Sequence, residues 1–334
     1  MKKLLLLILI PFLFFAQKKE TIKLNYPVKD YTGTTKSLEV IDARKDKKLK
    51  DIVFRGKYYA FNFPTDDLSD DLENWFEKTN KNRDKGINEI VLLIEDLNIS
   101  NEVRNKEIFC ILEMKFSTFL KKGDSYYFLK RYDNVISLST KEVGGIPDIF
   151  VENTQKVLQT LMFETYRATP LEIAIPRNDL LGYNEILKSN YPVFIENSLK
   201  DGVYLDYKSF FEQKAIENYQ LIKNGDEVVR AVNTNDDRIP ARKIYIYVEN
   251  GKAYKNTQAG FLELQKDQRG YFIRANKYIL FPEEINVSSG FYLFGAIGGA
   301  TVAVIQLSKY NKALKEERYN IYIDYLNGEY SFEK

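Results

Sequence analysis

The chain has 334 residues, yet it contains no histidine and only one cysteine. Without histidine it cannot form a Ser-His-Asp or Cys-His catalytic arrangement, a HExxH zinc site or any other histidine-bound metal site. The single cysteine, Cys110, cannot form an intrachain disulfide, and its place in the apolar run 108–112 predicts a buried, unreactive thiol. Catalysis would have to use paired carboxylates or Ser-Lys chemistry, so the composition favours a non-catalytic protein that needs no cofactor.

A dominant charge of one sign is also missing. Lys and Arg number 49 against 47 Asp and Glu, which gives a formal net charge of +2. This balance provides no general attraction to a phosphate backbone, so we expect no nucleic-acid partner. Hydrophobic residues make up 44% of the chain, which permits packed cores, and the 24 Tyr and 22 Phe favour sheets. The length predicts two domains.

Long apolar runs are few, and the first lies at the N-terminus. Met1-Lys2-Lys3 precedes the apolar stretch 4–15, which ends at Ala16. A short basic region, an apolar region and a small residue are typical of a secretory signal peptide, so we expect cleavage after Ala16. An uncleaved anchor is the alternative. The expected location is outside the cytoplasm, in the periplasm or associated with an outer membrane.

The second apolar run, 290–307, carries no charge and allows two interpretations. With its uncharged flanks it is long enough to span a bilayer, and Gly290, Gly295 and Gly299 include a GxxxG pair that would support membrane association. Its glycines and β-branched residues suit a buried strand or bend equally well. The tail 319–332 alternates and contains Asn327-Gly328, a hairpin signal, and this hairpin needs the earlier strands as its sheet. We therefore favour burial over a membrane span.

The first part of the chain combines strand and helix patterns. Strands are expected at 37–44, 51–54, 89–98, 105–119 and 125–139. One helix begins after Thr65 or Asp66 as its N-cap, and a second begins at Pro147 and runs to about Tyr166. This order predicts an α/β sandwich for residues 17–166, a mixed sheet with two helices on one face. The chain as a whole is expected to be α+β.

Three segments within 36–166 resemble the transport-auxiliary periplasmic proteins of Gram-negative bacteria. They are Val40-Ile-Asp-Ala-Arg44 at a strand end, Ile94-Glu-Asp-Leu97 in a later strand, and the closing helix over 154–163. The resemblance implies a non-catalytic partner in envelope assembly or transport. Asp42 and Arg44 are interpreted as an ion pair at the strand end, with a ligand-binding role as the alternative.

The prolines Pro170 and Pro176 place a linker at 167–178, and the remaining residues, 179–334, are expected to form a β-rich domain closed by the terminal hairpin. Its expected elements are a strand and helix over 202–211, an Asn250-Gly251 hairpin, and strands at 260–264 and 270–274. The order of a glycine-led Tyr/Phe motif, a small β unit, an Ala/Gly-rich segment and a closing Asn-Gly hairpin resembles a domain of uncharacterised exported bacterial proteins.

The second half carries two sets of candidate site residues. Tyr245, Tyr247, Tyr254 and Tyr271, with Tyr278, could offer flat aromatic faces to a sugar, although tyrosine is also an ordinary sheet residue. The second set could supply a glycosidase pair and consists of Glu263, Asp267, Glu283 and Glu284.

These patterns together predict an exported, non-catalytic envelope protein that binds a protein or an envelope component such as a glycan. The alternatives are a carboxylate-dependent glycan hydrolase and a protein anchored in the membrane through 290–307. No catalytic or metal-binding residue is assigned.

Overall fold

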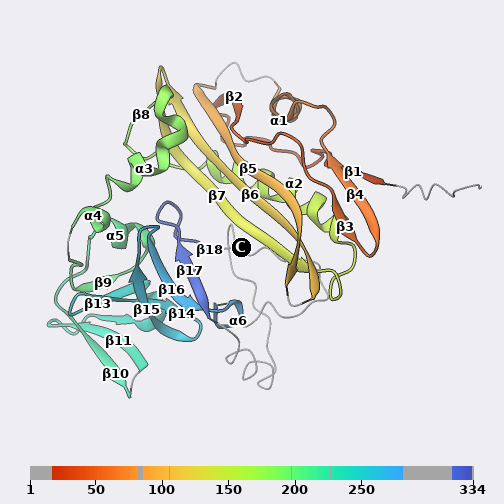
Figure 1. Ribbon diagram of the computed structural model, residues 1–334. Helices are drawn as coiled ribbons and strands as arrows, with labels where there is room; N and C mark the ends of the chain where they lie inside the picture. Colours follow the sequence, from red (N-terminus) through yellow and green to blue (C-terminus); the bar gives the residue numbers. More distant parts are fainter. Residues whose placement is uncertain are drawn as a thin grey trace, which may run out of the picture.

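The computed structural model describes residues 17–81, 86–104, 106–196, 198–225, 227–280 and 318–332. The expected signal peptide 1–16, the apolar run 290–307 and the candidate acids Glu283 and Glu284 lie outside these residues. The described chain is α+β, as predicted, with mixed sheets and helices in its first half and an antiparallel sheet in its second half (Figure 1). None of the described helices has the length and apolar character needed to cross a membrane.

A five-stranded mixed sheet forms the centre of the first half. Its strands in spatial order are β2 (Thr35–Asp42), β5 (Asn88–Arg104), β6 (Glu107–Lys122), β7 (Ser125–Ser139) and β8 (Ile175–Pro176). Only the β2–β5 pair is parallel, whereas β5, β6, β7 and β8 pair antiparallel. The segment 167–178 thus contains a short strand of the first sheet, and its role as a domain linker stays a prediction.

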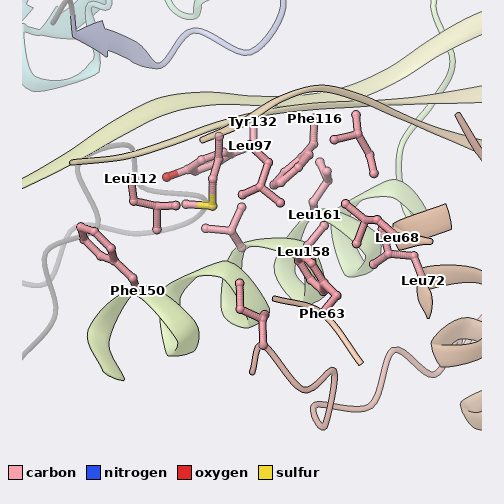
Figure 2. Packing of buried hydrophobic residues seen from close by; sticks show 14 of the residues in the cluster. Phe63, Leu68, Leu72, Leu97, Leu112, Phe116, Tyr132, Phe150, Leu158 and Leu161 are labelled. Atoms are coloured by element: carbon pink, nitrogen blue, oxygen red, sulfur yellow. The ribbon is translucent and has the colours of Figure 1, made fainter. Parts of the chain in front are cut away.

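Two helices cover one face of this sheet, α1 (Leu68–Thr79) and α2 (Ile146–Thr165). Figure 2 shows residues of both helices packed against strand residues such as Leu97, Leu112 and Phe116. The N-cap of α1 is Asp67, not Thr65 or Asp66, because its carboxylate accepts the backbone N–H groups of Ser69 and Asp70 at 2.9 and 3.3 Å. A small sheet, β1 (Lys18–Thr21), β4 (Lys57–Asn62) and β3 (Ile52–Phe54), contributes to the same core.

The second half is built on a seven-stranded sheet whose strand pairs are all antiparallel. Its strands in spatial order are β18 (Tyr330–Phe332), β17 (Tyr319–Ile323), β16 (Tyr271–Ala275), β15 (Gly260–Lys266), β14 (Lys252–Thr257), β13 (Ile246–Glu249) and β9 (Gly202–Tyr204). The predicted hairpins at Asn250-Gly251 and Asn327-Gly328 are both confirmed. The terminal hairpin joins the earlier strands through β16, as expected because an isolated hairpin is only marginally stable.

A three-stranded sheet on the outside of the second half was not predicted. It comprises β10 (Tyr219–Asn224), β11 (Glu227–Asn233) and β12 (Arg238–Pro240). Short helical segments complete the described chain: η1 (Arg177–Gly182), α3 (Tyr183–Lys188), α4 (Pro192–Ile195), α5 (Tyr207–Phe211), η2 (Ala241–Lys243) and α6 (Lys277–Leu280).

The two halves share a hydrophobic core. On β5, Ile90, Leu92 and Ile94 face the helices, whereas Val91 and Leu93 face the second half of the chain. Because both faces of this part of β5 are covered, its sequence is a continuous apolar run and does not alternate.

The terminal hairpin covers the outer edge of β7. Strand β8 pairs only with the first two residues of β7, so the remaining edge needs other partners. The backbone carbonyl of Arg131 accepts the Asn327 side-chain amide at 3.1 Å, and the side-chain amide of Asn134 donates to the Tyr330 carbonyl at 3.4 Å. In Figure 1 the hairpin, in blue, accordingly lies beside the long strands of the first sheet. This docking creates a cleft between the two sheets.

Candidate functional site

The cleft between the two sheets has a volume of about 810 Å³. One wall is the face of the first sheet opposite α1 and α2, and the other is formed by α3, the β15–β16 turn and β17. Charged and amide side chains line it together with a few aromatic rings: Asp96, Glu113, Lys115, Arg131, Asp133, Asn134, Asn184, Glu185, Lys188, Phe194, Gln268, Arg269, Tyr322, Asp324 and Tyr325. The volume falls within the range typical of small-molecule sites.

A β-bulge in β5 brings two consecutive acids to the cleft. The pairing of β5 with β6 shifts register between Ile94 and Asp96. Ile94 and Leu97 both pack in the core under the helices, although residues three apart in a regular strand face opposite sides. The bulge therefore turns Glu95 and Asp96 together towards the second half of the chain, as bulges do at many functional sites.

Lys115 on β6 lies between carboxylates of the two neighbouring strands. Its ammonium is 3.2 Å from a carboxylate oxygen of Glu95 and 3.6 Å from one of Asp133. Glu95 also accepts hydrogen bonds from the hydroxyls of Ser117 and Tyr183, at 2.7 and 3.0 Å. Glu95 is thus well satisfied, whereas among the described residues Asp133 has only the distant ammonium of Lys115 as an ion-pair partner.

The surroundings of Asp133 shift the pKa of its carboxyl. Burial raises the pKa of its carboxyl above the ordinary value. The positive charges of Lys115 and Arg131 oppose this rise, and the carboxylates of Asp324 and Glu95 add to it. Asp133 consequently takes up a proton at a higher pH than an exposed aspartate would.

The floor of the cleft is a buried ion pair between the two halves. Arg131 of β7 donates from Nε to Oδ2 of Asp324 at 2.8 Å and from Nη2 to Oδ1 at 2.5 Å. Its third nitrogen donates to the side chain of Asn184 at 2.7 Å. Burial alone would lower the pKa of Arg131, but the charge of Asp324 raises it well above the ordinary value, so the guanidinium stays charged. The pair fixes the terminal hairpin against β7 and α3.

Glu329, in the terminal turn, is a second acid whose pKa is raised. Burial, with repulsion from Asp324 and Glu164, raises its pKa from 4.5 to about 8, and Lys130 only partly opposes this. The folded state therefore binds the proton more tightly than the unfolded state, and stability falls as pH rises from about 4.5 to about 8.

We expect Glu329→Gln to remove this loss, because glutamine has the same shape and no charge. At pH 9 the variant should be more stable than the wild type by about 1 to 2 kcal/mol, a value discounted for the partial exposure of the side chain. At pH 4 the two should be equal. Urea unfolding at both pH values measures the difference, with Glu142→Gln on an exposed loop as the control. An equal difference at both pH values would contradict the assignment.

The residues expected to form an ion pair at the end of β2 do so. Arg44 donates from Nε and Nη2 to the two carboxylate oxygens of Asp42, at 2.9 and 2.8 Å. The ammonium of Lys47 is 3.2 Å from the same carboxylate, and both paired side chains are largely buried. Hydrogen bonds from Arg44 and the charge of Arg44 outweigh burial and lower the pKa of Asp42. Neither residue lines the cleft, although Asp42 pairs with Ile94, the residue before Glu95 and Asp96.

The four candidate tyrosines lie in two separate cores. Tyr271 is 4% exposed and packs with Phe194, Phe210 and Phe211, and Tyr245 packs against the same core. Tyr247 is 5% exposed and stacks on Tyr254 at a centroid distance of 4.8 Å, under the outer three-stranded sheet. They do not share one surface on which a sugar could stack. The side chain of Tyr278 lies outside the described part of the structure.

Of the candidate acids of the second half, only Glu263 and Asp267 lie in the described part of the chain, and they occupy different elements. Glu263 is on β15, and Asp267 is in the β15–β16 turn, where its carboxylate accepts N–H groups of Arg269 and Gly270 and the Tyr322 hydroxyl. Desolvation raises the pKa of Asp267, but these hydrogen bonds outweigh it and lower the pKa.

Cys110 is buried, as predicted, and burial raises the pKa of its thiol to about 11, so it stays protonated at neutral pH.

The sequence analysis named no residue of the cleft or of its ion pairs as a candidate site residue: Glu95, Asp96, Lys115, Arg131, Asp133 and Asp324. One signal was present, because Glu95-Asp96, within the segment quoted for the resemblance, directly follows the apolar run 90–94 of β5. Within the described part of the chain, no group of three or more Cys, Asp or Glu side chains is arranged to hold a metal ion.

Comparison with protein-family models, curated proteins and solved structures gave no match.

Proposed function

We propose that this chain is an exported, non-catalytic envelope protein that binds a polar partner or envelope component in the cleft between its two sheets. The observation that carries the proposal is a cleft of about 810 Å³ lined by charged groups on adjacent strands β5, β6 and β7. Side chains on paired strands are held in fixed positions, which reduces the entropy lost when a ligand binds.

The charged groups of the cleft are mostly held by partners within the protein, which supports binding more than catalysis. Arg131 and Asp324 neutralise each other, and Glu95 is occupied by Lys115, Ser117 and Tyr183. The only thiol is buried and protonated. Two hydroxyls donate to carboxylates here, Ser117 to Glu95 and Tyr322 to Asp267. Ser117 is fully buried and does not line the cleft, whereas burial and the bond to Asp267 raise the pKa of the Tyr322 hydroxyl. Neither hydroxyl is therefore the activated nucleophile that covalent catalysis requires. Export rests on the signal-peptide pattern of residues 1–16.

Affinity capture from envelope extracts tests this function with one charge-reversed variant. We expect the full-length protein to retain an envelope component and Asp96→Arg to lose it, because Asp96 lines the cleft. Asp124→Arg, in the exposed β6–β7 turn, makes the same change outside the cleft and should behave as the wild type. Equal capture by both variants would overturn the cleft as the site. Turnover of glycosides or peptidoglycan fragments by the wild type would overturn its non-catalytic character.

A further inference from the structure

We propose that the cleft accepts a short basic peptide, with lysine or arginine side chains of the ligand against Asp96 and Asp133, which lie on β5 and β7 on either side of Lys115. This inference rests on the proposed function, since it names the ligand of the same cleft.

The wall formed by the first sheet carries more negative than positive charge. Four carboxylates lie on this side of β5, β6 and β7, those of Glu95, Asp96, Glu113 and Asp133, and the one ammonium among them, that of Lys115, contacts only Glu95 and Asp133. Arg131 adds no free positive charge, because Asp324 holds it in a bidentate pair. A ligand cation would supply the missing charge and so relieve repulsion between the carboxylates.

The two acids that would meet the ligand are the least satisfied of the group. Among the described residues, Asp96 has no ion-pair partner within 4.0 Å, and Asp133 lies 3.6 Å from Lys115 without a hydrogen bond to it. Both line the cleft, and the side chain of Asp133 is 35% exposed. A lysine or arginine side chain can reach them without breaking the contacts of Glu95.

The opposite wall has the complementary character expected for a peptide. Lys188 lies over the ring of Phe194 at 5.3 Å, and Arg269 lies over the ring of Tyr322 at 5.7 Å. The amides of Asn184 and Gln268 belong to this wall, and that of Asn134 belongs to the wall formed by the first sheet. Cations and amides of this kind bind peptide carbonyls and a terminal carboxylate, so the cleft as a whole matches a dipolar chain with a basic side chain.

Because Asp133 titrates, binding at the proposed site should depend on pH. Its proton uptake occurs at a higher pH than that of an exposed aspartate, and Lys115, Arg131, Asp324 and Glu95 are the charged groups around it. Binding of a cation should therefore weaken as pH falls, beginning above the range in which exposed aspartates titrate.

Calorimetric titration of the full-length protein with defined tripeptides tests the inference. The probes are tri-lysine, its Nε-acetylated counterpart, which has nearly the same shape without side-chain charge, and tri-glutamate. We expect tri-lysine to bind, and the acetylated peptide to bind at least about tenfold more weakly or not at all. Asp96→Asn and Asp133→Asn should each weaken tri-lysine by about threefold to tenfold, whereas Asp124→Asn should leave it unchanged. Asp96 has no described partner, so its variant keeps the fold even where Asp133→Asn does not.

Equal binding of the acetylated peptide, preferential binding of tri-glutamate, or an unchanged affinity in Asp96→Asn would each overturn the basic-peptide inference. Failure of tri-lysine to bind would overturn it too, and would leave the cleft function intact provided that Asp96→Arg still loses its envelope component. Capture of that component by Asp96→Arg as by the wild type would overturn the cleft function itself.

Discussion

Replacing Arg131 by Met is expected to lower the free energy of unfolding by about 3 to 5 kcal/mol, because it leaves the carboxylate of Asp324 buried without its partner. The two side chains are only 6% and 5% exposed, so water cannot substitute for the lost guanidinium. Asp324→Leu should cost a similar amount by leaving the guanidinium unpaired. The double variant Arg131→Met/Asp324→Leu should lose at least about 2 kcal/mol less than the two single losses added together, since no buried charge remains.

Urea unfolding of the three variants measures this coupling, and the chain provides a matched surface pair as the control. Arg238 and Asp236 have the same bidentate arrangement through Nε and Nη2, but their side chains are 58% and 69% exposed. Arg238→Met should therefore cost less than about 1 kcal/mol. Additive losses in the buried pair, or a loss at Arg238 as large as that at Arg131, would contradict the role assigned to burial.

The fold could be predicted from local patterns because its elements carry strong local signals. The apolar run of β5, the proline at the start of α2 and the two Asn-Gly dipeptides each specify an element without reference to the rest of the chain. The outer sheet was missed because β10 (YQLIKN) and β11 (EVVRAVN) place apolar residues next to one another and not at every second position, so neither shows a regular apolar alternation.

The cleft could not be predicted in the same way because it depends on contacts between distant residues. Arg131 and Asp324 are 193 residues apart, and no local pattern indicates that they meet. The register shift at Ile94 decides whether Glu95 and Asp96 lie on one face, and a bulge of this kind is not specified by residue type alone. The tyrosines were the visible candidates because they are large and alternate, yet those are also the properties that place tyrosine in sheet cores.

Gly328→Ala is expected to be strongly destabilising because of a contact that the other Asn-Gly turn, at Gly251, does not make. Gly328 has a φ of +76°, and a Cβ added there would lie 2.6 Å from ring atoms of Tyr207. The backbone around it cannot move freely, since its N–H donates to the Asp324 carbonyl at 2.7 Å and its carbonyl accepts the Tyr245 hydroxyl at 3.0 Å. The substitution therefore combines left-handed strain with overpacking against an aromatic ring.

We expect Gly328→Ala to lower the free energy of unfolding by about 3 kcal/mol, and Gly251→Ala by only about 1 kcal/mol. Gly251 has nearly the same φ, +73°, in the two-residue turn between β13 and β14, but a Cβ added there meets nothing within 4 Å. The loss at Gly251 thus gives the cost of left-handed strain without a clash, and the larger loss expected at Gly328 adds the contact with Tyr207. Removing the ring in a Gly328→Ala/Tyr207→Ala variant should recover part of the loss, so that the double variant is more stable than the two single losses predict. Equal losses at the two glycines would show that the terminal turn can shift away from Tyr207, and hence that the hairpin is not held firmly against the cleft.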